Sequence, residues 1–455
     1  MTSKPDDPMV TAESETQAPM GAAELSLTRQ DEGIPMAETA AKTKPGTLKK
    51  ILGVIYNFFI ATVCGLTFGF TVQGFVISMA QDSVLGSRDF VVFWATGQQL
   101  AHHANPYDAA GLLKLERGAG LSTRYNVMYM RNLPAALPLV YPLGLLGLRA
   151  GSILWTVALL GCLAASVYIL WVMHGRQNNH RHWLGYSFGP ALICAIMGQT
   201  SLFALLGLVL FLRLHRTRPY LAGASLWLCM LKPHLFLPFG VVLLAWVAVT
   251  RSYKLLIGGA VAMAASCALA YRIDPMAWIE YGQMARKSGI GFEFIPCMSV
   301  LLRNWISKGT VWLQYAPAAL ACIWALGYYW TRRSTWDWMK NGSLLMVVGL
   351  LTAPYAWIYD ACVLIPALLY GAYVTRSRNV LIALAFLSAL VELALFGNIL
   401  RPSAIYLWTL WSAPAWFAWY VIASTPAARW TAARSGLKAM KWFRAGGAVQ
   451  GSSLE

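Results

Sequence analysis

GQTSLFALLGLVLFLRLHRTRPYLAGASLWLCMLKPHLFLP, residues 198–238, places long apolar runs between short polar breaks. One break is the Gly-Gln pair at its start, and another is formed by Lys232, Pro233 and His234. A bilayer-spanning helix needs about 20 apolar residues, and a proline inside such a helix removes a backbone hydrogen bond. The pattern therefore fits either long membrane-spanning helices or short helices that meet at polar breaks.

The rest of the chain is as apolar as this stretch. Of the 455 residues, 58% are hydrophobic and only 12% are charged, and the mean hydropathy is +0.52. This composition excludes an ordinary soluble protein and is typical of a polytopic membrane protein. Clear apolar runs occupy residues 51–79, 151–173, 254–271, 309–330, 358–374, 379–396 and 404–424. Apolar blocks interrupted by polar residues occupy 185–213, 219–249 and 342–374.

We therefore predict an all-α polytopic membrane protein with about 10 to 13 transmembrane helices. The stretch 133–148 holds three prolines, so we expect it to be re-entrant or part of an outer cap and not a straight span. Eight cysteines are scattered singly without metal-type spacing, which supports neither a disulfide framework nor a zinc site.

Basic segments predict the orientation of the chain in the membrane. Cytoplasmic loops carry an excess of Lys and Arg. The segment KTKPGTLKK (42–50) precedes the first apolar run, and RWTAARSGLKAMKWFR (429–444) follows the last. We therefore expect both termini on the cytoplasmic side of a bacterial-type cytoplasmic (inner) membrane. The loops 80–131 and 272–308 and the polar breaks then face outward.

The termini differ from the membrane part in composition. Residues 1–45 are rich in Pro, Thr, Ser, Ala and Glu and lack hydrophobic periodicity, which predicts a disordered cytoplasmic tail. Residues 46–428 are predicted to form the transmembrane domain, and residues 429–455 a basic cytoplasmic tail. The first 50 residues carry 6 of the 36 basic and 8 of the 19 acidic side chains, which leaves 30 and 11 elsewhere. Because these basic residues lie in short clusters between apolar runs, they indicate membrane anchoring or contact with lipid phosphate and not nucleic acid.

The first outer loop contains SRDFVVFWATGQQLAHHANPYDAAGLL, residues 87–113. Asp89 precedes the apolar FVVFW, which predicts an amphipathic helix lying on the membrane surface. A carboxylate in such a place can act as a general base, or it can simply cap the helix. We expect Asn105, Pro106 and Asp108 to end that helix, because the residue before a proline avoids helical geometry.

Lys232 and His234 are the other candidates. An ionisable residue near hydrocarbon is costly and is by default a functional hypothesis. Two cationic donors would suit an anionic ligand. The alternative is that Lys232 reaches the interface with its long side chain.

Four stretches together resemble glycosyltransferase family 87. Residues 87–113 look like its first outer loop, and 131–155 like its proline-rich stretch leading to a Trp. Residues 198–238 resemble its Gly-Gln, Ala-Gly and Lys-Pro pattern, and 350–366 its late motif. They follow the order of the family, and the resemblance covers roughly residues 50–420. The family belongs to the membrane-embedded GT-C superfamily and includes polyprenyl-phosphate-mannose-dependent mannosyltransferases.

The resemblance implies a GT-C-type fold and an inverting sugar transfer. Mannose or a similar hexose would pass from a polyprenyl-phosphate donor to a hydroxyl of a glycolipid or glycan on the outer membrane face. Asp89 would be the general base. Membrane lipids would be further partners, and neither a metal ion nor another cofactor is implied.

The remaining site residues fall into two groups. Candidates to bind the donor phosphate are Lys232, His234, Arg131, Arg124, Arg286 and Lys287. Candidates to line the sugar or acceptor pocket are Gln199, Tyr355 and Asp360; a hydrogen bond at the helix break is the alternative for Gln199. The chain departs from the family in its late motif. Ala353 stands where the family often has Ser, and Tyr355 and Tyr359 stand where a His is often met.

A transporter or flippase of a lipid-linked sugar is the competing interpretation, because broken helices that meet at polar residues are also typical of transporters. A transporter would show repeat symmetry, which this sequence lacks. A transferase needs a long outer loop that carries a carboxylate, and residues 80–131 supply one.

Overall fold

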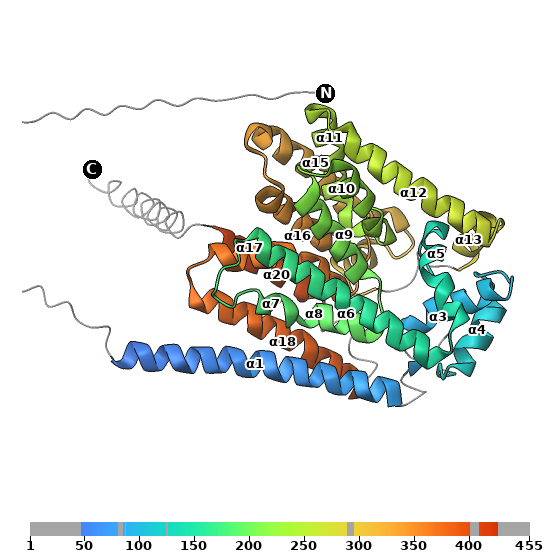
Figure 1. Ribbon diagram of the computed structural model, residues 1–455, viewed down its shortest axis with the longest axis horizontal. Helices are drawn as coiled ribbons and strands as arrows, with labels where there is room; N and C mark the ends of the chain where they lie inside the picture. The colour runs from blue at the N-terminus through green and yellow to red at the C-terminus, as the bar shows by residue number, and fades with distance from the viewer. Residues whose placement is uncertain are drawn as a thin grey trace, which may run out of the picture. The chain divides into compact units, whose positions relative to one another are not determined.

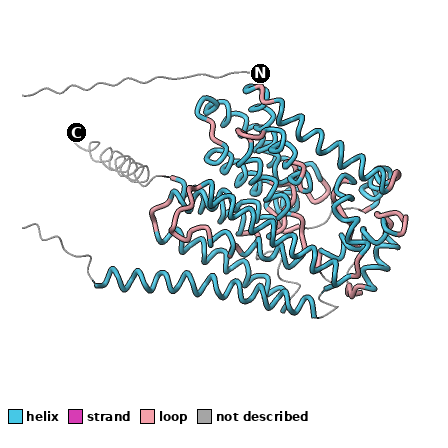
Figure 2. The backbone as a smooth tube through the Cα atoms, viewed as in Figure 1, coloured by secondary structure: helices cyan, strands magenta, loops and turns pink. Residues whose placement is uncertain are grey.

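The computed structural model describes residues 47–80, 85–86, 88–123, 126–288, 295–400 and 409–425. Throughout these ranges the chain forms helices and loops, without a strand (Figure 2). Residues 1–53 and 54–455 form separate units, and the architecture below is that of the second. The predicted tails 1–45 and 429–455 lie outside the described residues.

The helices follow one another in this order: α1 (Thr47–Ala80), α3 (Phe90–Ala101), α4 (Ala109–Gly118), η1 (Pro134–Ala136), α5 (Leu137–Val140), η2 (Tyr141–Leu145), α6 (Leu148–Met173), α7 (Trp183–Tyr186), α8 (Gly189–Met197), α9 (Ser201–Leu214), α10 (Pro219–Ser225), η3 (Leu228–Leu231), η4 (Pro233–Phe236), α11 (Leu237–Thr250), α12 (Tyr253–Ile273), α13 (Ala277–Lys287), α14 (Met298–Ile306), η6 (Val311–Gln314), α15 (Ala316–Arg332), η7 (Arg333–Thr335), η8 (Trp338–Gly342), α16 (Ser343–Thr352), η9 (Ile358–Leu364), α17 (Ile365–Val374), α18 (Arg378–Leu400) and α20 (Ser412–Ser424).

Several of these helices are suited to a bilayer. Within the described ranges, three are long and apolar enough to cross a membrane: α6, α12 and the continuous η4–α11. Shorter apolar helices cover Pro134–Leu145, Trp183–Met197, Ser201–Leu214, Pro219–Leu231 and Ile358–Val374. The prediction of an all-α polytopic membrane protein is confirmed. The number of membrane crossings stays a prediction.

Each interrupted apolar block is divided into short helices. Block 185–213 becomes α8 and α9, separated at Gly198, whose φ of +79° is the left-handed conformation that favours glycine. Block 219–249 is divided between η3 and η4, at Lys232. Block 342–374 is divided between α16 and η9. Breaks at polar residues are therefore confirmed in all three blocks, although the η4–α11 part of block 219–249 is long enough to cross a membrane.

Prolines set the form of the stretch 133–148. Pro134, Pro138 and Pro142 each lie in the first two positions of a short helix, η1, α5 and η2 respectively. A proline is accepted there because those N–H groups have no partner within the helix. No straight span forms in this stretch, as predicted.

Helix α3 packs inside the protein, at the end of the second unit where α4, α5 and α13 also lie (Figure 1). Eight of its twelve residues are buried. Its backbone is close to that of η2, since a Cβ at Gly144 would lie 1.9 Å from the carbonyl oxygen of Gly97. The prediction of an amphipathic helix on the membrane surface is wrong, because both faces of α3 meet protein.

The NPYD segment has a structural role, as expected, although it starts a helix instead of ending one. Asp108 is the N-cap of α4, and its carboxylate accepts a 2.7 Å hydrogen bond from the amide of Gly111. The side chain of Asn105 accepts one of 2.7 Å from the amide of Tyr107.

Glycines let α10 and α12 approach each other closely. A Cβ at Gly223 would lie 1.8 Å from the carbonyl oxygen of Leu255, and one at Gly258 would lie 2.0 Å from that of Tyr220. Small residues at helix contacts are typical of membrane proteins, where van der Waals packing drives association. This contact joins the Lys232 block to the helix that precedes α13.

We expect Gly258→Ala to destabilise the protein by roughly 1–3 kcal/mol, the usual cost of overpacking. The added methyl group would meet backbone and not a flexible side chain. Thermal unfolding of the purified protein in detergent measures the effect. The control is Gly161→Ala in α6, where a Cβ has no heavy atom within 4 Å. Equal unfolding midpoints for the two variants would refute the close approach.

Candidate active site

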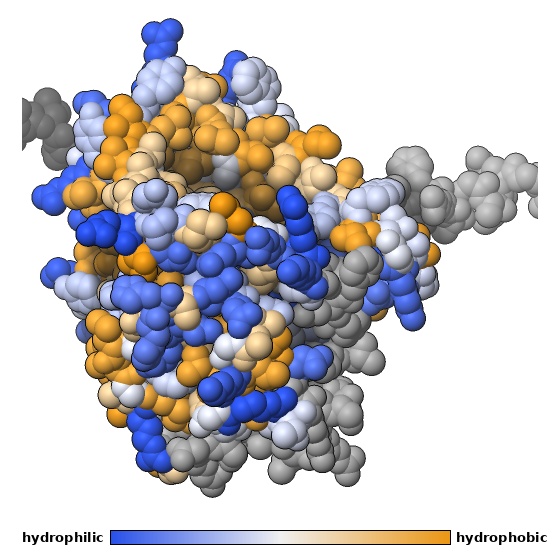
Figure 3. Space-filling view, turned by 90° about the vertical axis from the view of Figure 1, so that its right-hand side faces the viewer, coloured by the Kyte–Doolittle hydropathy of each residue, from blue (hydrophilic) through white to orange (hydrophobic). Residues whose placement is uncertain are grey.

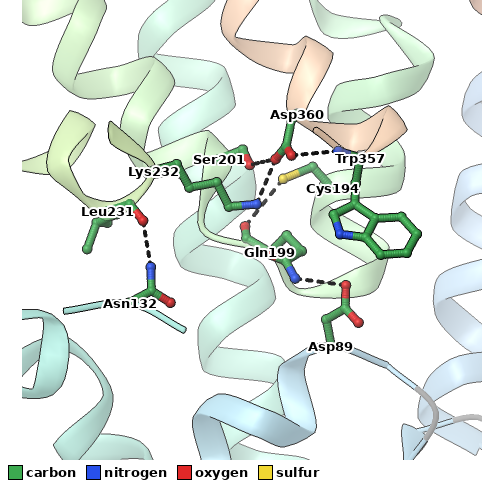
Figure 4. A network of polar contacts seen from close by, with 9 residues as sticks. All are labelled: Asp89, Asn132, Cys194, Gln199, Ser201, Leu231, Lys232, Trp357 and Asp360. Atoms are coloured by element: carbon green, nitrogen blue, oxygen red, sulfur yellow. Dashed lines mark hydrogen bonds and ion pairs between the residues drawn. The ribbon is translucent and has the colours of Figure 1, made fainter. Parts of the chain in front are cut away.

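Asp89 lies at the N-terminus of α3, but its side chain makes no capping hydrogen bond. Instead, its Oδ2 accepts a 2.8 Å hydrogen bond from Nε2 of Gln199 (Figure 4). The interpretation of Asp89 as a simple helix cap is therefore wrong. The carboxylate faces the break between α8 and α9, from which Gln199 projects.

The α8–α9 break is held by backbone contacts. The amide of Gln199 donates a 3.0 Å hydrogen bond to the carbonyl of Cys194, and Trp155 Nε1 donates one of 2.7 Å to the carbonyl of Gly198. A Cβ at Gly198 would lie 2.6 Å from the Cβ of Phe90, the residue after Asp89. The backbone amide of Gln199 thus helps to hold the break in shape, while the side chain of Gln199 hydrogen-bonds to Asp89.

Arg88 holds the segment before α3 in place. Its side chain is 2% exposed. The guanidinium donates to the carbonyl of Ile196, to Ser152 Oγ at 2.7 Å and to Thr156 Oγ1 at 3.2 Å. A buried charge is tolerated when its N–H groups are paired in this way. Sequence reasoning missed Arg88, and the only available signal was its position beside Asp89.

Lys232 and Asp360 form a buried ion pair, with 2.6 Å between Nζ and Oδ1. Oδ1 of Asp360 also accepts a 2.5 Å hydrogen bond from Ser201 Oγ, and Oδ2 accepts one of 2.9 Å from the Trp357 amide. The side chain of Asp360 is fully buried and that of Lys232 is 10% exposed. Lys232 therefore does not extend to the membrane interface.

A second contact fixes the Lys232 break from the other side. The side chain of Asn132 donates a 2.7 Å hydrogen bond to the carbonyl of Leu231, one residue before Lys232 (Figure 4). The proline-rich segment and the Lys-Pro-His break are thereby joined at the site.

His234 and Tyr355 form a stacked pair beside the ion pair. Their ring centroids are 3.7 Å apart and the rings are inclined by 27°. His234 is 9% exposed, and its Nε2 makes no hydrogen bond. Arg131 is close enough for its charge to act on Tyr355. Its carbonyl accepts a 3.3 Å hydrogen bond from the hydroxyl of Tyr281.

The structure thus brings together most of the predicted site residues: Asp89, Gln199, Lys232, His234, Tyr355 and Asp360, with Arg131 nearby. Arg286 and Lys287 are exposed in the last turn of α13, and no described contact joins them to this cluster. Arg124 lies outside the described residues. Sequence reasoning did not single out Ser201 as a site residue, and no pattern marked it.

The surroundings of Asp89 favour a carboxyl group that can accept a proton. Burial raises its pKa above the usual range, although the Gln199 hydrogen bond and the positive charge of Lys232 act in the opposite direction. A raised pKa makes a carboxylate a stronger base. In the described part of the chain, no group of three or more His, Cys, Asp or Glu side chains is arranged to hold a metal ion.

The family model described as Glycosyltransferase family 87 matches residues 133–354. That range contains Gln199, Lys232 and His234, and it ends just before Tyr355. No curated protein and no solved structure matches the chain. The match covers just under half of the 455 residues, so this part of the chain is similar to glycosyltransferase family 87, and the similarity indicates a glycosyltransferase.

Proposed function

We propose that this glycosyltransferase moves mannose or a similar hexose from a polyprenyl-phosphate donor to a hydroxyl of a glycolipid or glycan. The reaction takes place on the outer face of a cytoplasmic (inner) membrane, and Asp89 is the general base. One observation carries the proposal: the half-buried carboxylate of Asp89, from the loop 80–131 that the sequence predicts to be outer, lies in the same polar cluster as a buried lysine.

The chemistry needs a base but no general acid. Asp89 takes the proton of the acceptor hydroxyl while that oxygen attacks the anomeric carbon of the donor sugar. The bond from this carbon to the phosphate oxygen breaks, and the lipid phosphate leaves as an anion. Because a phosphate is a stable leaving group, it does not have to be protonated. A single displacement inverts the anomeric configuration.

The second carboxylate of the cluster is unsuited to act as a nucleophile. A retaining mechanism uses one carboxylate to form a covalent sugar intermediate. Asp360 is fully buried and already accepts from Lys232, Ser201 and the Trp357 amide. This arrangement supports inversion, with Asp89 as the reacting carboxylate.

Lys232 and His234 are proposed to stabilise the departing phosphate. Charge that develops in the transition state is best met by donors already fixed in a dry site. Lys232 Nζ has three donors, of which the ion pair with Asp360 uses one. His234 is held by its stack on Tyr355 with Nε2 unbonded. Arg131 supplies further positive charge beside Tyr355.

An amphiphilic donor suits the face at the α3–α13 end. Figure 3 shows hydrophobic residues around a hollow in the upper part of this face, and hydrophilic residues gathered below it. The outer segments also expose large apolar side chains, Met276, Ile279, Trp305, Ile306 and Trp312. Trp is enriched where protein meets the membrane interface. A phosphate group could thus reach polar residues while its isoprenoid chain stays in lipid.

Asp89→Asn tests the base directly. We expect kcat for transfer from synthetic polyprenyl-phosphate mannose to fall roughly 10²–10⁴-fold, the usual contribution of a general base, with little change in KM. The matched control is Asp108→Asn, because Asp108 only caps α4 and Asn is an equally good cap. Its activity should stay at the wild-type level.

Two outcomes would contradict the proposal. Wild-type activity in Asp89→Asn would remove the base assignment. Absence of transfer from any polyprenyl-phosphate sugar, together with movement of a lipid-linked sugar across vesicles that contain the protein, would favour the transporter interpretation.

Substitutions at Lys232 and Asp360 can separate the effect of Lys232 on the stability of the protein from its effect on the transfer reaction. Lys232→Met leaves Asp360 buried without its cation, so we expect a loss of about 3–5 kcal/mol in the free energy of unfolding. The double variant Lys232→Met/Asp360→Asn removes both charges and should recover most of this stability. If Lys232 stabilises the departing phosphate, the double variant should still be inactive. Thermal unfolding and transfer rates measure the two effects, and wild-type rates in the double variant would exclude Lys232 from the chemistry.

A further inference from the structure

Tyr359 lies between the two charged parts of the site. It is in η9, directly before Asp360, and is buried. The Nζ of Lys232 is 4.9 Å from the centroid of its ring. Its hydroxyl lies close enough to the carboxylate of Asp89 to favour the ionised form of that group. One side chain therefore contacts both the proposed base and the lysine of the ion pair.

The fold of η9 determines this placement. The helix begins after Trp357, whose backbone amide is bonded to the carboxylate of Asp360. The ring of Trp357 stacks on that of Tyr359, with 6.2 Å between centroids and 21° between planes. Two consecutive residues of η9 therefore have different partners. Asp360 binds Lys232 and Ser201, and Tyr359 lies near Asp89.

We propose that Tyr359 is a positioning residue that orients the carboxylate of Asp89 toward the acceptor hydroxyl and links it to the Lys232–Asp360 pair. This inference rests on the proposed role of Asp89 as general base. A carboxylate offers about four lone-pair sites. Gln199 from the α8–α9 break donates to one of them, and a hydrogen bond from Tyr359 of η9 at a second would restrict the plane of the group. The remaining sites are then directed toward substrate.

The charge of Asp89 depends on every element that surrounds it. Gln199 from the α8–α9 break donates a hydrogen bond to the carboxylate, and the nearby hydroxyl of Tyr359 from η9 and the positive charge of Lys232 favour the same ionised form. The negative charge of Asp360 opposes it. The adjacent Arg88 directs its guanidinium to Ser152, Thr156 and backbone carbonyls. Tyr359 is the donor among these that can be removed with the loss of a single oxygen atom.

Tyr359→Phe keeps the ring beside Lys232 and removes only the hydroxyl. We expect kcat to fall roughly 10- to 100-fold with KM nearly unchanged, within the range for a group that assists proton transfer. The hydroxyl stabilises the ionised carboxylate, so its loss raises the pKa of Asp89. The acid limb of the kcat–pH profile should therefore move to higher pH by roughly one unit, a tenfold change in the ionisation constant.

A second variant strengthens the interaction of residue 359 with Asp89 instead of removing it. Replacing Tyr359 with 3-fluorotyrosine makes the phenol more acidic and strengthens its hydrogen bond to the carboxylate. We expect the acid limb to move to lower pH while the fold is retained. Tyr373→Phe is the control, because the hydroxyl of Tyr373 makes no hydrogen bond and its ring stacks on His174, outside the cluster. Its rate and pH profile should equal those of the wild type.

The outcomes distinguish this inference from the proposed function. An inactive Asp89→Asn with an unshifted acid limb in both Tyr359 variants would overturn the role of Tyr359 and leave Asp89 as the base. An active Asp89→Asn would remove the proposed base, whatever the Tyr359 variants do. A lower kcat in Tyr359→Phe without any pH shift would also overturn the inference, because it would indicate only structural support.

Discussion

The buried ion pair between Lys232 and Asp360 is the interaction on which the site depends. A charged side chain inside a membrane domain is costly unless it is paired. Asp360 also binds Ser201, so one carboxylate gathers contacts from all three interrupted apolar blocks. Each block supplies one member at or beside its break: Ser201 begins α9, Lys232 lies between η3 and η4, and Asp360 itself lies in η9. The helix breaks and the polar cluster are thus two aspects of one arrangement.

Local features of the sequence predicted the helices and their breaks. Run length, glycine and proline act within a few residues, which is why the division of block 185–213 at Gly198 could be anticipated. The pairing of polar side chains could not be anticipated in the same way. Asp89 and Gln199 are 110 positions apart, and Lys232 and Asp360 are 128 apart. Contacts over such separations depend on how several helices pack together, and no local pattern encodes them.

Two errors at the start of α3 share a physical cause. The helix was expected on the membrane surface, and Arg88 was not singled out. Neither the surface placement of α3 nor the omission of Arg88 allowed for a polar loop that enters the protein. In the structure, Ser152 and backbone carbonyls satisfy the guanidinium, so the loop can enter the protein together with the apolar residues after it. A charged residue with enough hydrogen-bond partners thus allows the segment beside it to be buried. The sequence alone does not reveal this burial, because it does not show which groups will bind Arg88.

Gly198, whose backbone is left-handed, also limits how α3 and the α8–α9 break can move relative to each other. The backbone there touches Phe90, while Gly97 and Gly144 bring α3 against η2 with no side chain between them. Rotamer changes cannot loosen contacts made by backbone atoms, so α3 and the α8–α9 break should move as one rigid body. Slow fluctuations would then leave the distance from Asp89 to Gln199 nearly constant. In the proposed reaction, Asp89 would then stay in place during turnover, and the rearrangements that admit the lipid donor and release the product would occur in other segments.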